Sequence, residues 1–163
     1  MNDDNKPEST VLSDEVQLVI FHLAKEHYGL PITKVQDINR LMPITKMPSV
    51  PDFLEGIINL RGKIIPVVDL RKRFSLPAVE HTDSTRIIIV QIRRELVGII
   101  VDSVTEVARI SSKDIEPPPA TFSADIDVKH VLGVGKRADS LITLLDIDQI
   151  MTDKEAADLR QSL

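Results

Sequence analysis

The chain consists largely of short apolar runs, rich in β-branched residues, that are separated by polar turn signals. Clear examples are VQLVIFHLA at residues 16–24, RIIIVQI at residues 86–92 and LITLL at residues 141–145. Runs of this length and composition form strands rather than helices. With turn signals spaced by roughly 8 to 12 residues, the pattern predicts about nine or ten short strands in a barrel or sandwich, not alternating β and α units.

Two of these segments are apolar almost without interruption. They are residues 86–92 and residues 96–110, and the polar residues 93–95 join them. Strands that lack polar alternation are typically buried on both faces. We therefore predict a hairpin that lies inside the protein, as a barrel interior would allow.

Other segments predict local structure. Residues 16–24 and 28–32 fit one hairpin, and residues 57–68 fit a second that turns at residues 61–63. Residues 32–41 fit either a helical turn or an extended segment.

Two short helical turns are also predicted. Residues 51–56 begin with Pro51 and fit one turn that Gly56 ends. Asp69 is predicted to cap a helical turn in DLRKRF, because its carboxylate can accept backbone N–H groups there.

The two ends differ from the middle. Residues 1–14 are polar and include Pro7, which predicts a disordered tail. A helix is predicted from about Ile147, and we assign residues 153–163 to a C-terminal helix. The folded domain is therefore expected at residues 15–152.

Composition excludes several classes of chemistry. There is no cysteine, so disulfides, thiolate metal sites and thiol nucleophiles are excluded. The net charge of −5 and the 3% aromatic content argue against a nucleic-acid-binding barrel, although the basic run at residues 71–73 leaves a local patch open. No apolar run approaches the length of a membrane span, and we expect a soluble protein that is not exported.

Motifs for enzyme chemistry are weak. The four histidines lack zinc-site spacing, and GVGK at residues 133–136 is too short for a phosphate loop, so no metal or cofactor is predicted. Asp69, Asp102 and Asp146 each end an apolar run, where a carboxylate can accept backbone N–H groups. An aspartate-based hydrolase would require these three side chains to converge in one pocket.

The segment GIINLRGKIIPVVDL carries an arginine between two apolar runs. Arg61 and Gly62 lie at the predicted turn, where glycine tolerates a positive φ angle. An arginine held there can pair with a carboxylate. Asp37 is the nearest acidic candidate in a segment otherwise flanked by apolar residues, here Val35 and Ile38. The alternative interpretation is a solvated turn arginine.

Several stretches together resemble the CheW family of bacterial chemotaxis coupling proteins. They are YGLPITKVQDI, FLEGIINLRGKIIPVVDLRKRF, VGIIVDSVTEV and GVGKRADSLITLLDID, in the family's order and with similar spacing. The resemblance implies two five-stranded β-barrel subdomains that share a hydrophobic core. It also implies a non-catalytic adaptor that joins the cytoplasmic tip of transmembrane chemoreceptors to the regulatory domain of the histidine kinase CheA.

Site residues follow from the matching motifs. The resemblance implies a receptor-binding groove between the subdomains, for which we expect Val35, Asp37, Ile38, Arg61, Ile87 and Val104. Glycines at positions Gly56, Gly62 and Gly98 are expected to shape the backbone.

The expected location is the cytoplasm, with recruitment to membrane receptor arrays only through receptors. One alternative is a CheW-like scaffold of another sensory system, such as type IV pilus or gliding motility. Another is a fragment of CheA or CheV, but the chain starts with Met1 and contains no kinase or receiver sequence, which favours a stand-alone adaptor.

Overall fold

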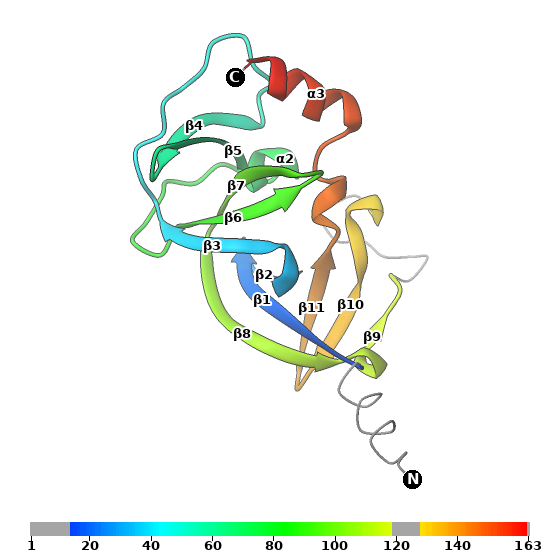
Figure 1. The fold of residues 1–163 in the computed structure, drawn as a ribbon. Coiled ribbons are helices and arrows are strands. Elements are labelled where there is room, and N and C mark those ends of the chain that lie inside the picture. Colours follow the sequence, from blue (N-terminus) through cyan, green and yellow to red (C-terminus); the bar gives the residue numbers. More distant parts are fainter. Residues whose placement is uncertain (1–13, 119–127, 163) are drawn as a thin grey trace.

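The computed structural model of the protein describes residues 14–118 and 128–162. Within these residues the chain forms eleven strands in two sheets, with short helices and one longer C-terminal helix (Figure 1). The predicted mainly β class is therefore confirmed. The predicted tail lies outside the described residues except for Asp14.

The first sheet, which we call the first barrel, has strand order β8-β1-β2-β11-β10-β9. Neighbouring strands are antiparallel except β2 and β11. It has six strands rather than the five implied, because the short β9 pairs with β10. Its strands are β1 (Glu15–Leu23), β2 (Glu26–Pro31), β8 (Ser103–Ser111), β9 (Ile115–Glu116), β10 (Val131–Arg137) and β11 (Ser140–Leu145).

The second sheet, the second barrel, has strand order β3-β6-β7-β5-β4. Its strands are β3 (Val35–Arg40), β4 (Leu54–Leu60), β5 (Lys63–Asp69), β6 (Arg86–Ile92) and β7 (Glu95–Val101). The two edges of this sheet meet where Thr45, just after β3, forms a bridge to Ile57 of β4. Gly56 permits this approach, since a Cβ atom there would lie 2.2 Å from the Thr45 carbonyl oxygen.

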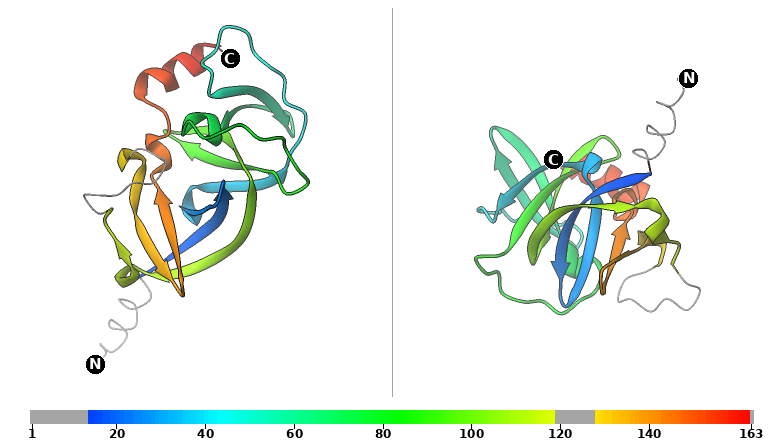
Figure 2. Two further views of the ribbon diagram at one scale, coloured as in Figure 1. Left: turned by 180° about the vertical axis from the view of Figure 1, so that it is seen from behind. Right: turned by 90° about the horizontal axis from the view of Figure 1, so that it is seen from below.

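Helical segments connect and cover the barrels. They are η1 (Ile32–Lys34), α2 (Leu70–Arg73), η2 (Ser112–Asp114), η3 (Val128–His130), η4 (Ile147–Gln149) and α3 (Asp153–Ser162). Figures 1 and 2 show α3 at the end of the molecule formed by the second barrel, and β8 as a long curved strand that runs from that barrel into the first. No helix in the described part of the chain is both long and apolar enough to cross a membrane.

The strand β6 shows how the two barrels share a core. Ile87 and Ile89 lie inside the second barrel, whereas Ile88, Val90 and Ile92 lie in a larger cluster that both barrels line. Because successive side chains of a strand point to opposite faces, one strand serves both clusters. The prediction that β6 is buried on both faces is confirmed.

The strand β1 plays the same part for the first barrel. Leu18 and Ile20 lie inside that barrel, whereas Val19, Phe21 and Leu23 enter the shared core. The shared core therefore contains side chains from both sheets and joins the two barrels into one packed body.

Three local predictions are wrong in part. A single hydrogen-bonded turn does begin at Pro51, whose carbonyl accepts the Leu54 N–H, but it does not extend to Gly56 because β4 already begins at Leu54 and pairs with β5. The segment at residues 96–110 is interrupted at Asp102, and β8 is largely exposed along its middle. The helix predicted from Ile147 is a 3-10 turn. The helix α3 starts only at Asp153, where the Thr152 hydroxyl accepts the Glu155 N–H and caps it.

Replacing Val101 tests the shared core. Val101 is 1% exposed and belongs to that cluster, so Val101→Asp would bury an unpaired charge. We expect a loss of stability of about 4 kcal/mol or more, or no cooperative unfolding, in a thermal melt followed by circular dichroism. Val107→Asp is the control, because Val107 on β8 is 48% exposed, and its melting temperature should stay close to that of the wild type. An unchanged melt of Val101→Asp would contradict the assigned register.

Candidate functional site

The turn between β4 and β5 presents Arg61. Arg61 and Gly62 are its two central residues and have φ angles of 51° and 89°. Glycine adopts this conformation freely, whereas for arginine it costs about 1 kcal/mol or more. The Gly62 N–H donates to Asn59 Oδ1 at 2.9 Å, which fixes the turn. Arg61 is thus held in a defined position at the end of the second barrel.

A bulge in β3 determines which face of the second sheet carries the Asp37 side chain. Val35 pairs with Val90 and Asp37 with Ile89, so Gln36 is an extra residue between them. Opposed residues of paired strands share a face of the sheet. Asp37 therefore shares the face of Ile89, which lies inside the second barrel, and the bulge gives the strand this change of register.

Arg61 and Asp37 form an ion pair, which is one of the two interpretations that the sequence left open. Arg61 Nη2 donates to Asp37 Oδ2 at 2.5 Å. This hydrogen bond holds the pKa of the Asp37 carboxyl below its ordinary value. The side chains are 71% and 34% exposed, so the pair lies at the surface, where it joins β3 to the turn of the opposite sheet edge.

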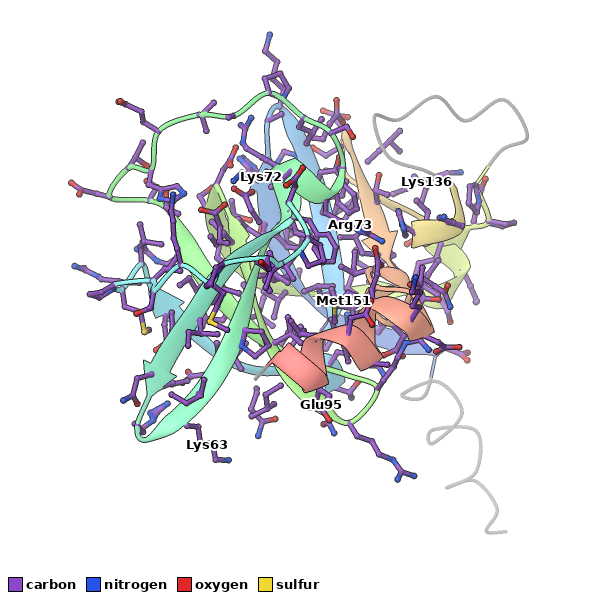
Figure 3. The ribbon with its side chains drawn as sticks, turned by 90° about the horizontal axis from the view of Figure 1, so that it is seen from above. Lys63, Lys72, Arg73, Glu95, Lys136 and Met151 are labelled. Atoms are coloured by element: carbon purple, nitrogen blue, oxygen red, sulfur yellow. The ribbon has the colours of Figure 1, made fainter. Side chains whose placement is uncertain are left out.

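A pocket of about 280 Å³ adjoins this pair. Its lining includes both charged residues, Leu60, Lys63 and Leu96. Figure 3 shows Lys63 at the turn end of the β4–β5 hairpin, far from Arg73 and Met151 beside α3. The pocket combines apolar side chains with charge, which suits recognition of another protein.

The other predicted site residues differ in exposure. Ile38 is 36% exposed on β3, which is the first strand in the order of the second sheet. Val35 on β3 and Val104 on β8 are half-buried and border the shared core. These three side chains are accessible in part to a partner.

Ile87 is different, because it is 0% exposed inside the second barrel. A Cβ atom on Gly98 would approach its Cγ2 to 2.9 Å, so the space above Ile87 is filled by close packing with β7. Ile87 supports the barrel from within and cannot touch a partner in this conformation.

The three aspartates do not converge. Asp69 accepts the backbone N–H groups of Arg71 and Lys72, so the predicted cap of α2 is present. Asp69 and Asp102 line a common pocket of about 190 Å³, but Asp146 is not part of its lining. The convergence that a hydrolase would require is absent from this pocket.

The basic run of α2 does not form a free patch either. Arg71, Lys72 and Arg73 pair with Asp102, Glu55 and Glu155 in turn. These carboxylates come from the junction of β7 and β8, from β4 and from α3. The run therefore connects three separated elements, an arrangement that no local pattern in the run predicts.

Two of these pairs are well enclosed. Arg71 donates from Nε and Nη2 to the two Asp102 oxygens at 2.9 and 2.6 Å, and Ala24 N–H also donates to Oδ2 at 2.9 Å. Burial raises the pKa of Asp102, but these hydrogen bonds outweigh it and lower the pKa overall. The Arg73 guanidinium contacts Glu155 through two hydrogen bonds and lies 4.5 Å from the centre of the Phe53 ring.

Glu155 also completes a capping box. It accepts from the Thr152 N–H at 2.8 Å, while its own N–H donates to Thr152 Oγ1 at 3.1 Å. The motif TDKE at residues 152–155 is a sequence signal for this helix start, and it was missed in the sequence analysis.

These observations define a two-barrel β domain with an exposed charged turn that is ion-paired to the edge strand β3. The profile of the CheW-like domain matches residues 17–155, and the chain belongs to this family. A chemotaxis protein CheW from Bacillus subtilis is 36% identical over 141 residues, covering 86% of this chain and 89% of that one. CheW from Klebsiella aerogenes is 33% identical over 141 residues, with coverage of 86% and 84%.

A solved structure shows the same likeness. The crystal structure of the scaffolding protein TtCheW from Thermoanaerobacter tengcongensis matches with a TM-score of 0.79 and 43% identity. The match covers 86% of this chain and 90% of that one.

The two kinds of ion pair should differ in their effect on stability. Asp102→Asn removes charge from an enclosed, three-donor site, and we expect the free energy of unfolding to fall by about 1–3 kcal/mol. Asp37→Asn weakens an exposed pair and should change the free energy of unfolding by less than about 1 kcal/mol. Chemical denaturation of both variants provides the comparison, and equal losses would contradict the assigned roles.

Acid should weaken the fold partly through Asp102. The pKa of Asp102 is lower in the folded state than in the unfolded state. The stability that the ionised Asp102 contributes is therefore fully present above the unfolded pKa of about 4, and it is lost as the pH falls through the folded-state pKa. We expect Asp102→Asn to be less stable than the wild type near neutral pH, and the difference to shrink below about pH 4. Thermal melts over that range measure this, and a constant difference would rule out the linkage.

Proposed function

We propose that the chain is a non-catalytic adaptor that couples chemoreceptors to the histidine kinase CheA in bacterial chemotaxis. Family membership supports this proposal, and so do relatives that are named chemotaxis proteins and a solved relative that is named a scaffolding protein. The observation that carries the proposal is the shared core, because it holds the surfaces of two barrels in one rigid body. An adaptor needs such a body to keep two docked partners in a fixed relation.

The proposed receptor surface is centred on Arg61 and Asp37. Arg61 is exposed and held by a strained turn, and Ile38 and Val35 on β3 offer apolar area near it. Val104 extends the surface along the border of the shared core. Charged groups set the register of such a contact, and the apolar side chains supply buried area. Ile87 is assigned a supporting role beneath this surface.

The proposed second partner is the regulatory domain of CheA. The resemblance implies that this domain is homologous to the chain and that the two dock barrel to barrel. We further propose a cytoplasmic location, with membrane association only through receptors, and no binding to nucleic acid. The overall charge of −5 and the pairing of the α2 cations with carboxylates support the last point.

Reversing the charge of Arg61 tests the receptor surface. Arg61→Glu would face Asp37 with a like charge, and we expect at least a roughly tenfold loss of affinity for a receptor cytoplasmic fragment. The melting temperature should change little, since an exposed charge contributes little to folding. Titration calorimetry with purified receptor fragment measures the affinity.

Arg109→Glu is the matched control, because Arg109 is exposed on β8 of the first barrel. It should bind the receptor fragment as the wild type does. Equal losses in both variants would show a general charge effect and would remove Arg61 from the proposed surface. A folded wild-type protein that binds neither receptor fragment nor CheA would shift the function to another sensory system.

A further inference from the structure

The end of the β1–β2 hairpin carries two histidines that face each other. His22 and His27 are directly opposed in the register of the two strands. The His22 carbonyl accepts the Asp102 N–H at 3.1 Å on the side away from β2. His22 and His27 are therefore a non-hydrogen-bonded pair, the position in which cross-strand side chains come closest. Their ring centres are 4.1 Å apart.

One nitrogen of this pair has no assigned role in the fold. His22 Nε2 is buried and has no hydrogen-bond partner among the residues that the structure describes. Burial and the neighbouring His27 lower the pKa of His22, against an opposing effect of Asp102. An imidazole nitrogen that carries no proton and has no hydrogen-bond partner offers its lone pair to a metal ion.

Acidic groups surround the pair without occupying it. Asp102 acts electrostatically on His22, and Glu106 interacts with His27. Both carboxylates already accept hydrogen bonds from arginines, Asp102 from Arg71 and Glu106 from Arg137. They favour a cation nearby, while His22 Nε2 remains without a hydrogen-bond partner in the described part of the chain.

We propose that His22 and His27 form a two-imidazole binding site for a divalent transition-metal ion such as Zn²⁺ or Ni²⁺. Imidazole nitrogen suits these ions, whereas Mg²⁺ and Ca²⁺ prefer oxygen ligands. Two imidazoles on one ion have ring centres about 5 Å apart, given metal–nitrogen bonds of about 2.0 Å. The observed rings are perpendicular and 4.1 Å apart, so binding requires their centres to separate by about 1 Å. A change at χ1 moves the ring centres, and rotation about χ2 then turns the nitrogens toward the ion.

His22 Nε2 is buried, so the same side-chain rotation must also turn it toward solvent, where water fills the remaining coordination positions. No group of three potential ligands occurs in residues 14–118 and 128–162, so the site offers two protein ligands and moderate affinity. The five-residue spacing of the two histidines matches no helical zinc motif, because strand pairing and not helical periodicity brings them together. The site belongs to the first barrel and shares no residue with the proposed receptor surface.

Titration calorimetry of the untagged full chain with ZnCl₂ and with NiCl₂ near neutral pH tests the proposal. We expect the wild type to bind one ion per chain. The affinity should fall roughly tenfold or more in His22→Gln and in His27→Gln, because each variant loses a second ligand that the hairpin holds at high effective concentration. His81→Gln, in the exposed loop after α2, is the matched control and should bind as the wild type does. Lowering the pH should weaken binding, since protons compete for the same nitrogens.

Circular dichroism melts confirm that each variant is folded. If His22→Gln fails to fold, a folded His27→Gln decides the question. The proposal is overturned if the wild type binds neither ion, or if folded His27→Gln binds as tightly as the wild type.

Discussion

The structure depends on strands whose two faces are both buried. In β6 and β1, alternate side chains enter a barrel interior and the shared core, so each strand belongs to two packing units at once. A change of register by one residue would exchange these two sets of side chains. The shared core therefore fixes the pairing of the strands and the relative position of the barrels. That fixed position is what an adaptor with two partners requires.

Ion pairs reinforce this arrangement where the chain passes between elements. The three cations of α2 reach carboxylates on the β7–β8 junction, on β4 and on α3. The Arg71–Asp102 pair also includes the Ala24 N–H in the β1–β2 turn, so it connects the two barrels. The Arg61–Asp37 pair is more exposed and contributes less to folding. Its position on an exposed turn fits a role in recognition, because binding residues are often carried by loops on a rigid scaffold.

Local patterns predicted much of the fold. The apolar runs locate most strands, and Asp69 is the predicted cap of α2. The pairing of Arg61 with Asp37 is one of two interpretations that the turn and the apolar neighbours of Asp37 allow. Errors arose where distant contacts decide the outcome. Pairing with β5 makes residue 54 part of a strand, and the partners of the α2 cations lie far away in sequence. The burial of Ile87 likewise follows from the register of β6 and not from its motif.

The central claim is that one rigid body presents a receptor surface on the second barrel. Nuclear magnetic resonance of isotopically labelled protein, titrated with a receptor cytoplasmic fragment, tests it most directly. The account predicts that amide signals change most in β3, around Asp37 and Ile38, and at the turn that carries Arg61, with little change in β9 and β10. Changes concentrated in β9 and β10, with β3 unaffected, would contradict the account.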